Sequence, residues 1–229
     1  LMSQVATQAQ TKQILTAVKR YLYDPALGGI RLNTDFKQEQ HDLGRAFSFV
    51  YGEKENGSIF CHMVVMLAYA LYQQGFVLEA WEALSSLYRL AAQTDKSKIY
   101  PCLPEYFNSS GRGMYSYLTG SASWFMLTLL TQSFGVRGQG GDLLIQPKLT
   151  REQFGSCGRV SISRTFSRRR IQVTFFNPRR LECGRYRIKR LLLNSEPLLI
   201  VEDSKVVITS EVIANLPQAK LNTIEIHLC

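Results

Sequence analysis

The spacing of apolar residues changes partway along this chain, and that change constrains the fold more than any other feature. Over residues 3–22, 59–74, 76–92 and 121–133, apolar side chains recur at helical intervals. A turn-forming cluster at residues 138–142 comes next, and beyond it the apolar residues alternate in short β-branched runs. The sequence therefore predicts a helical region and then a region of strands, with the boundary between residues 135 and 142.

The second region has the pattern of a β-sandwich, because glycine and proline residues separate its short runs as turns separate strands. The predicted strands are residues 143–146, 160–166, 171–176, 186–193, 198–201, 206–209 and 223–228. In the first region, residues 59–74 are apolar on nearly all sides, which is typical of a helix buried among several neighbours. We therefore expect further helices upstream of Leu1.

A chain of 229 residues with 45% hydrophobic and 20% charged residues can bury a core and is not disordered. It has no apolar run of the roughly 18 residues that a membrane span needs, and its first residues lack the pattern of a signal peptide. The five cysteines are scattered without a CxxC pair, so neither a zinc site nor a disulfide framework is indicated. These features predict a cytoplasmic protein without a metal site.

The formal net charge of +9 sits almost entirely in the second half of the chain. Residues 1–135 hold 11 Lys and Arg against 10 Asp and Glu, whereas residues 136–229 hold 16 against 8. A basic region is compatible with nucleic-acid binding. The basic residues alternate with strand residues and lack a nucleic-acid motif, however, which favours a solvated surface.

A glycine- and tyrosine-rich loop runs into Thr119, Gly120 and Ser121, and an apolar helix follows at once. A helix start has unpaired backbone N–H groups and a partial positive charge. The two hydroxyls add donors and Gly120 lets an anion approach the backbone, so the segment is a candidate phosphate or carboxylate pocket. The alternative is an ordinary N-cap at Ser121, which stabilises a helix by roughly 0.5–2 kcal/mol without binding a ligand.

The second candidate segment is a charged loop, residues 52–58, that leads into an apolar helix carrying His62. The imidazole is either a core side chain with satisfied hydrogen bonds or a donor directed into a cleft, where it would bind phosphate. Lys54, Glu55 and Asn56 would then be ligands for sugar hydroxyls or an anion. The alternative is an exposed loop, since Asn56-Gly57 is also favourable turn chemistry.

Together the two segments resemble glycoside hydrolase family 94, which comprises inverting disaccharide and oligosaccharide phosphorylases and the phosphorylase-like domain of cyclic β-1,2-glucan synthase. The resemblance rests on residues 54–57, on His62 within an apolar helix and on residues 117–124. It implies an α+β multidomain fold. Residues 1–137 would be the last part of an (α/α)6 barrel, and residues 138–229 a C-terminal antiparallel β-sandwich.

The resemblance also implies roles for individual residues. His62, Thr119 and Gly120 match the family's phosphate-binding groups, and Ser121 is the next group in reach. Lys54 and Glu55 match a loop that lines the acceptor-sugar side, with Asn56 beside them. The other residues expected to border the same cleft are Glu105, Arg112, Tyr115 and Tyr117.

The implied reaction is phosphorolysis of a β-linked di- or oligoglucoside to a sugar 1-phosphate with inverted configuration. Inorganic phosphate is the expected co-substrate, in place of the second carboxylate of an inverting hydrolase, and no other cofactor is expected. The family's general acid, an aspartate, and a phosphate-binding arginine are expected upstream of this chain. The chain alone is therefore predicted to be inactive, with the N-terminal part of the enzyme and a second copy in a homodimer as expected partners.

Other functions stay open on the sequence alone. A non-catalytic carbohydrate-binding protein would bind sugar without any dependence on phosphate. A nucleic-acid-binding protein using the basic second half would lose affinity steeply with salt. A hydrolase that activates water needs two carboxylates across a cleft, and the sequence offers no convincing pair.

Overall fold

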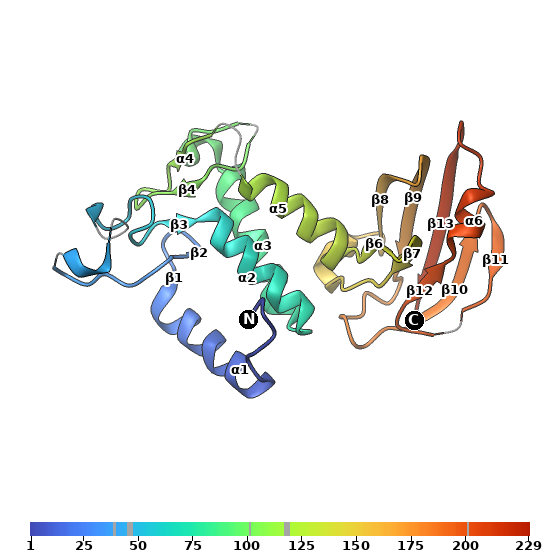
Figure 1. Cartoon of the computed structure of the whole chain (residues 1–229), viewed down its shortest axis with the longest axis horizontal. Helices are drawn as coiled ribbons and strands as arrows, with labels where there is room; N and C mark the ends of the chain where they lie inside the picture. The colour runs from blue at the N-terminus through green and yellow to red at the C-terminus, as the bar shows by residue number, and fades with distance from the viewer. Residues whose placement is uncertain (39, 45–47, 101, 117–119, 201) are drawn as a thin grey trace. The chain divides into compact units, whose positions relative to one another are not determined.

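A computed structural model describes residues 1–38, 40–44, 48–100, 102–116, 120–200 and 202–229. The chain divides into two compact units, Leu1–Thr128 and Leu129–Cys229, whereas the resemblance placed a domain boundary at residues 137 and 138. The first unit is mainly helical and the second is built mainly of strands (Figure 1). The predicted α+β class is therefore confirmed. The described residues form no closed barrel, so the barrel stays a prediction.

The first unit combines helices with very short strands. Its helices are α1 (Gln8–Ala17), α2 (Cys61–Gln73), α3 (Val77–Ala92), α4 (Thr94–Ser97) and α5 (Gly120–Thr128). Its strands are β1 (Tyr23–Asp24), β2 (Gly29–Ile30), β3 (Ile59–Phe60), β4 (Tyr106–Phe107) and β5 (Gly113–Met114). A π-helical turn, Val18–Leu22, continues α1, another, Leu129–Ser133, continues α5, and a 3-10 turn covers His41–Leu43.

The two long central helices form where the sequence predicts them. Gly75, at φ +83°, ends α2, because the N–H groups of Gly75 and Phe76 return to the carbonyls of Tyr72 and Leu71. α3 begins two residues later and packs against α2. Much of α2 is buried, as its nearly uniform apolar surface predicts. α1, in contrast, begins at Gln8 rather than residue 3, since Thr7 and Gln10 form a capping box there.

The second unit contains two sheets. The strands are β6 (Val136–Gln139), β7 (Asp142–Ile145), β8 (Arg159–Phe166), β9 (Arg169–Phe176), β10 (Ile188–Leu193), β11 (Glu196–Leu198), β12 (Val206–Ile208) and β13 (Leu221–Leu228). A 3-10 turn (Arg151–Phe154) and α6 (Ser210–Ala214) connect them. One sheet has the order β11-β10-β13-β9-β8 and the other β12-β7-β6. Buried residues from both sheets form one hydrophobic core, including Val136, Ile145, Val173, Ile208 and Ile226.

The prediction of a purely antiparallel sandwich is wrong in one respect. β13 pairs with β9 in parallel, from Leu221 opposite Arg170 to His227 opposite Phe176, while every other described pair in the unit is antiparallel. The side-chain period does not reveal this, because parallel and antiparallel strands alternate in the same way. The sequence also misses β6, which starts before the glycine cluster that predicts a turn.

In the described part of the chain, no helix is both long enough and apolar enough to cross a membrane. All five cysteines are free thiols.

Candidate functional site

Three strands bring most of the candidate residues to one place. β3, β4 and β5 form an antiparallel sheet in which Phe60 lies opposite Tyr106 and Tyr106 lies opposite Met114. The end of β3, the start of β4 and the end of β5 therefore lie side by side. The backbone confirms this: the Cys61 N–H donates to the Glu105 carbonyl (2.9 Å), and the Glu105 N–H donates to the Tyr115 carbonyl (3.2 Å). Residues following β3 and β5 thus lie next to Glu105.

His62 lies in the first turn of α2, against the start of α5. A Cβ atom on Gly120 would lie 3.2 Å from His62 Cε1 and 3.4 Å from Nδ1, so the ring lies directly against the Gly120 backbone. The imidazole also contacts the Trp124 ring, and the two ring centroids are 5.8 Å apart. The imidazole is half-buried, and no hydrogen bond to its nitrogens occurs within the described residues. The structure therefore brings His62 and Gly120 together, across 58 residues of sequence.

The Ser121 hydroxyl has a structural partner. Ser121 is only 1% exposed, and its Oγ donates to the Pro104 carbonyl at 3.0 Å. Because α5 begins at Gly120, Ser121 lies inside the helix, and the interpretation of Ser121 as the N-cap is wrong. The hydroxyl instead ties the start of α5 to the segment that precedes Glu105. Thr119 and Tyr117 lie outside the described residues.

The charged loop is held from both ends by polar contacts. The Glu53 carboxylate accepts hydrogen bonds from Tyr106 Oη (3.0 Å) and Asn108 Nδ2 (3.2 Å). Asn56 donates to the Phe49 carbonyl (2.6 Å) and accepts from Asn33 (3.1 Å). The amide of Asn56 is thus engaged in holding the loop. Glu53 and Tyr106 are positioning residues that the sequence interpretation missed, because two-residue strands leave no periodic signal.

Lys54 stands at the tip of this loop, in the left-handed region at φ +48°. Its Nζ lies 4.4 Å from the centroid of the Tyr115 ring. A hydrogen bond with Tyr115 raises the pKa of Lys54, as do the nearby carboxylates of Glu105 and Glu55. Lys54, Glu55, Glu105 and Tyr115 therefore form one polar cluster beside the short sheet.

Glu55 carries an unsatisfied acceptor. Its Oε2 is buried and has no hydrogen-bond partner among the described residues. Buried polar atoms in folded proteins are nearly always paired, so an orphan of this kind points to a ligand or water. A sugar hydroxyl is one donor that would satisfy it. Arg112, in contrast, lies exposed in the turn between β4 and β5, at the end of that hairpin opposite Glu105 and Tyr115.

The loop is anchored at its far side by a part-buried ion pair. Both Nε (2.9 Å) and Nη2 (2.6 Å) of Arg31 donate to Asp24 Oδ2, and Nη1 donates to the Gly57 carbonyl (2.6 Å). Burial raises the pKa of Asp24, but hydrogen bonds from Leu27, Arg31 and Ala26 outweigh burial and hold the pKa below its ordinary value. The β1–β2 hairpin thus fixes the loop that carries Lys54 and Glu55.

Among the described residues, no cluster of three His, Cys, Asp or Glu side chains has the geometry of a metal site. The ligands that the site does offer suit an anion and a neutral hydroxylated molecule. These are a histidine at a helix start, a lysine, two carboxylates and a tyrosine.

Comparisons with known proteins find several relatives. Cellobionic acid phosphorylase of Neurospora crassa is 25% identical over 186 residues, covering 72% of this chain and 23% of the relative. Cyclic beta-(1,2)-glucan synthase of Rhizobium meliloti is 27% identical over 165 residues, covering 67% of this chain and 6% of the relative. A 3-O-beta-D-glucopyranosyl-beta-D-glucuronide phosphorylase of Paenibacillus borealis is 26% identical over 158 residues, covering 64% and 20%.

The chain thus spans less than a quarter of the length of each of these three relatives. The profile of the Glycosyl hydrolase 94 superfamily catalytic domain matches residues 1–135, which contain every candidate site residue named above. This chain belongs to the Glycosyl hydrolase 94 superfamily.

Proposed function

We propose that the first unit supplies phosphate- and sugar-binding groups for an inverting β-glucoside phosphorylase. The observation that carries the proposal is the contact of the His62 ring with the Gly120 backbone at the start of α5. A helix start binds anions through backbone N–H groups and partial positive charge, and an imidazole adds a further donor. Family membership and the phosphorylases among the relatives support the same reaction class.

In this proposal phosphate lies at the start of α5, beside the His62 ring, where both can donate to it. Thr119 and Gly120 supply further donors, and Ser121 holds that helix start in position through Pro104. The phosphate replaces the water and second carboxylate of an inverting hydrolase, and attacks the sugar from the face opposite the leaving oxygen. The histidine and the helix dipole stabilise its negative charge during the attack.

The sugar side is proposed for the polar cluster. Lys54 and Tyr115 offer hydrogen-bond donors, while Glu105 and the orphan oxygen of Glu55 offer acceptors for hydroxyl groups. Asn56 contributes by holding the loop, since its amide is engaged with Phe49 and Asn33. Arg112 and Tyr117 stay as candidates for the rim of the cleft.

Phosphate binding is testable by proton NMR, because the chain has only three histidines, His41, His62 and His227. Titration with inorganic phosphate should shift the imidazole signals of His62 and leave those of His227 unmoved. His62→Gln should raise the dissociation constant by about 10- to 100-fold, since hydrogen bonds to charged groups contribute about 1.5–3 kcal/mol.

His227→Gln is the matched control, because His227 stacks on Phe176 in the sheet of the second unit. Gly120→Ala is a second probe, because the added methyl meets the His62 ring while alanine favours the helix. Equal phosphate affinity in wild type, His62→Gln and Gly120→Ala would overturn the proposal.

Turnover is a separate measurement. With a β-linked glucobiose and phosphate, we expect the purified 229-residue chain to release no sugar 1-phosphate, because no carboxylate of this chain matches the family's general acid. Sugar binding that is independent of phosphate would favour the carbohydrate-binding alternative instead.

A further inference from the structure

The orientation of the His62 ring depends on packing. A histidine that binds a ligand through one ring nitrogen is commonly oriented by a hydrogen bond at the other, which also fixes the tautomer. In the part of the chain that the structure describes, neither nitrogen of His62 has such a partner. The direction in which the ring nitrogens point is therefore set by the groups that pack against the ring.

The imidazole lies in a slot formed by Gly120 and Trp124, one turn apart on α5. Residues four apart lie on the same face of a helix. Large helical side chains also lean toward the N-terminus, over the residue four positions earlier. The Trp124 indole therefore leans over Gly120, which has no side chain to fill the space. The His62 ring occupies that space, in contact with the Gly120 backbone and at 49° to the plane of the indole.

Tyr69 supports the indole from α2. It lies seven residues beyond His62, which is about two helical turns, so both rings are on the same side of α2. Tyr69 meets the Trp124 ring edge-on, with centroids 5.6 Å apart and an interplanar angle of 78°. α2 and α5 pack against each other here (Figure 1). The indole is therefore held between two rings of α2.

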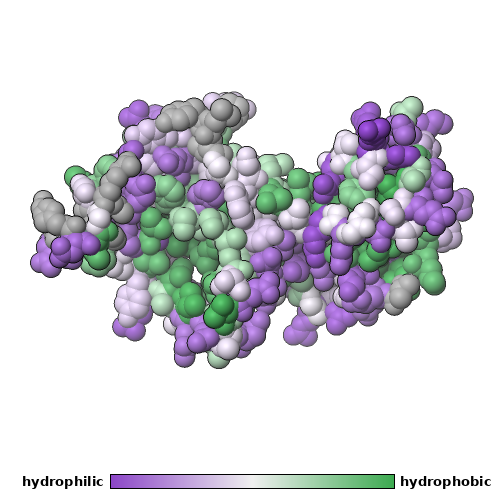
Figure 2. Space-filling model, viewed as in Figure 1, coloured by the Kyte–Doolittle hydropathy of each residue, from purple (hydrophilic) through white to green (hydrophobic). Residues whose placement is uncertain are grey.

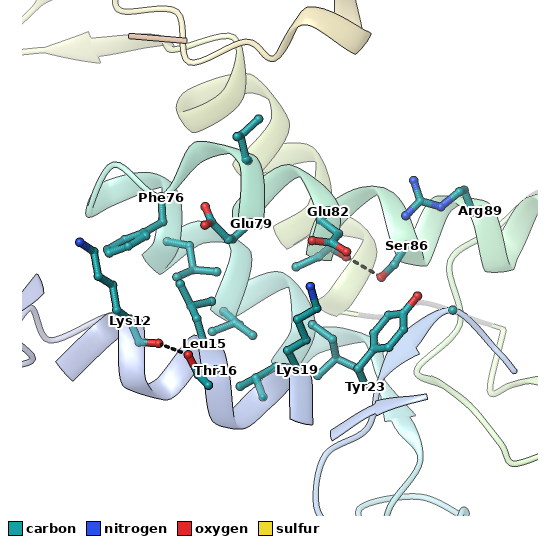
Figure 3. Close-up of a pocket in the computed structure, with 17 residues that line it drawn as sticks. Lys12, Leu15, Thr16, Lys19, Tyr23, Phe76, Glu79, Glu82, Ser86 and Arg89 are labelled. Atoms are coloured by element: carbon teal, nitrogen blue, oxygen red, sulfur yellow. Dashed lines mark hydrogen bonds between the residues drawn. The ribbon is translucent and has the colours of Figure 1, made fainter. Parts of the chain in front are cut away.

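The slot is separate from the apolar hollow that α2 shares with α1 and α3. Leu67 and Leu71 line that hollow together with Leu15 and Phe76 (Figure 3). Figure 2 shows hydrophobic surface in that region, between α1 and α2. Leu71 is about two and a half turns beyond His62 and thus lies on the opposite side of α2. None of the three rings lines the hollow, so a substitution in the slot leaves the packing of that face intact.

We infer, on the basis of the phosphate site proposed above, that Trp124 is a positioning residue for phosphate binding. The indole, supported by Tyr69, holds the plane of the His62 imidazole against the start of α5. A ring nitrogen and the backbone N–H groups then donate to the same anion. Trp124 acts through His62 and not by contact with the phosphate. An aliphatic side chain would fill the slot without fixing the ring, because aromatic pairs prefer defined ring geometries.

The test follows the Gly120 amide signal in proton–nitrogen NMR spectra during titration with inorganic phosphate, which gives a dissociation constant for every variant. Trp124→Leu should raise this constant about two- to tenfold, the range that corresponds to the energy of one aromatic pair. Trp124→Phe keeps a ring beside the imidazole and should bind within about twofold of wild type. Trp81→Leu is the matched control, the same change at a half-buried tryptophan of α3, and should bind as wild type does.

A double-mutant cycle separates positioning from a general loss of structure. In the His62→Gln background, Trp124→Leu should have no further effect on the dissociation constant, because the indole acts through the imidazole. A general loosening of α5 would instead weaken phosphate binding in both backgrounds. Nuclear Overhauser cross peaks between the His62 and Trp124 ring protons of wild type report the ring contact itself, without phosphate.

Three results would contradict the role of Trp124 while leaving the phosphate site in place. Trp124→Leu could bind phosphate as tightly as wild type, it could weaken binding equally with and without His62, or Trp124→Phe and Trp81→Leu could bind as weakly as Trp124→Leu. If wild type binds no phosphate, the phosphate site itself is overturned, and the role of Trp124 with it. Circular dichroism of each variant checks that the helices are retained.

Discussion

The two units of this chain are stabilised in different ways. The second unit has strands of up to eight residues, such as β8, β9 and β13, around a single hydrophobic core. The first unit has strands of only two residues, and its loops are fixed by side chains such as Asp24, Glu53 and Asn56. The candidate site lies in the first unit, among loops that individual polar contacts hold in place beside the buried faces of α2 and α3. Partial burial in these loops leaves polar groups in position to bind a ligand. Burial in the second unit produces an apolar core instead.

The largest effect is expected in the core of the second unit. Phe154 is fully buried there and meets the Tyr186 ring edge-on at 6.4 Å. Phe154→Ala should lower the free energy of unfolding of that unit by about 3–5 kcal/mol, because it leaves a cavity. Urea unfolding followed by far-ultraviolet circular dichroism should show this loss as a lower urea midpoint for the second unit. Both tryptophans, Trp81 and Trp124, lie in the first unit, so a tryptophan transition shifted equally would contradict the separation of the two units.

The next largest effect is expected at the ion pair that anchors the charged loop. Asp24→Asn should lower the free energy of unfolding at neutral pH by about 1.5–3 kcal/mol, because Arg31 loses a charged partner. The folded-state pKa of Asp24 lies below its ordinary value of 3.8, so the pair stabilises the fold above that value. That contribution is lost as the pH falls through the folded-state pKa, and wild type and variant should converge there.

Asp35→Asn is the matched control for the ion pair. Asp35 pairs with Lys37, whose side chain is 82% exposed. Denaturant unfolding at neutral pH should not distinguish this variant from wild type, because exposed pairs contribute little. If Asp35→Asn lowered the free energy of unfolding as much as Asp24→Asn, the part-buried Asp24–Arg31 pair would be no more stabilising than an exposed pair.

Two tyrosines offer a direct comparison between the units. Tyr186 Oη accepts from the Leu149 N–H at 2.9 Å and lies 3.2 Å from the Pro147 carbonyl, in the core of the second unit. Tyr186→Phe leaves a buried N–H without its acceptor and should cost about 1–3 kcal/mol of unfolding free energy. Thermal unfolding followed by circular dichroism measures this cost, and an unchanged transition would contradict the structural role of the hydroxyl.

Among the variants with a measurable cost, the smallest effect is expected for the tyrosine of the first unit. Tyr106→Phe removes the hydrogen bond to Glu53, but Asn108 still bonds that carboxylate, so the expected cost is about 0.5–1.5 kcal/mol. Burial, with the Glu53 carboxylate, also raises the pKa of Tyr106. A spectrophotometric titration should therefore show one fewer late-ionising tyrosine in the variant. A loss exceeding that of Tyr186→Phe would reverse the comparison between the units.

The sequence predicts the parts of this fold that are long enough to show a period. Four elements lie within about two residues of their predicted bounds: α2, α3, β8 and β9. Each is long enough for its apolar residues to repeat at a recognisable interval. β1 to β5 could not be predicted, because two residues carry no period and their pairing depends on distant partners. The parallel pairing of β13 with β9 cannot be read from the sequence either, because parallel and antiparallel strands have the same side-chain period.

The family resemblance identifies the candidate site residues, but only the fold shows which of them lie close together. His62 and Gly120 are brought together by the packing of α2 against α5, which no spacing in the sequence indicates. The contacts that fix Glu53, Asn56 and Ser121 were not predictable, because each joins a side chain to a distant segment. Whether these residues bind phosphate and sugar stays a prediction.

The order of strands in the larger sheet has a consequence for biosynthesis. Of the five strands in this sheet, β13 is the last in sequence to leave the ribosome, yet it lies between β10 and β9. Until it arrives, the β8–β9 and β10–β11 hairpins have no strand to join them, and each exposes an unpaired edge that invites aggregation. The larger sheet therefore stays in two separate parts, each with an exposed edge, until β13 inserts between them.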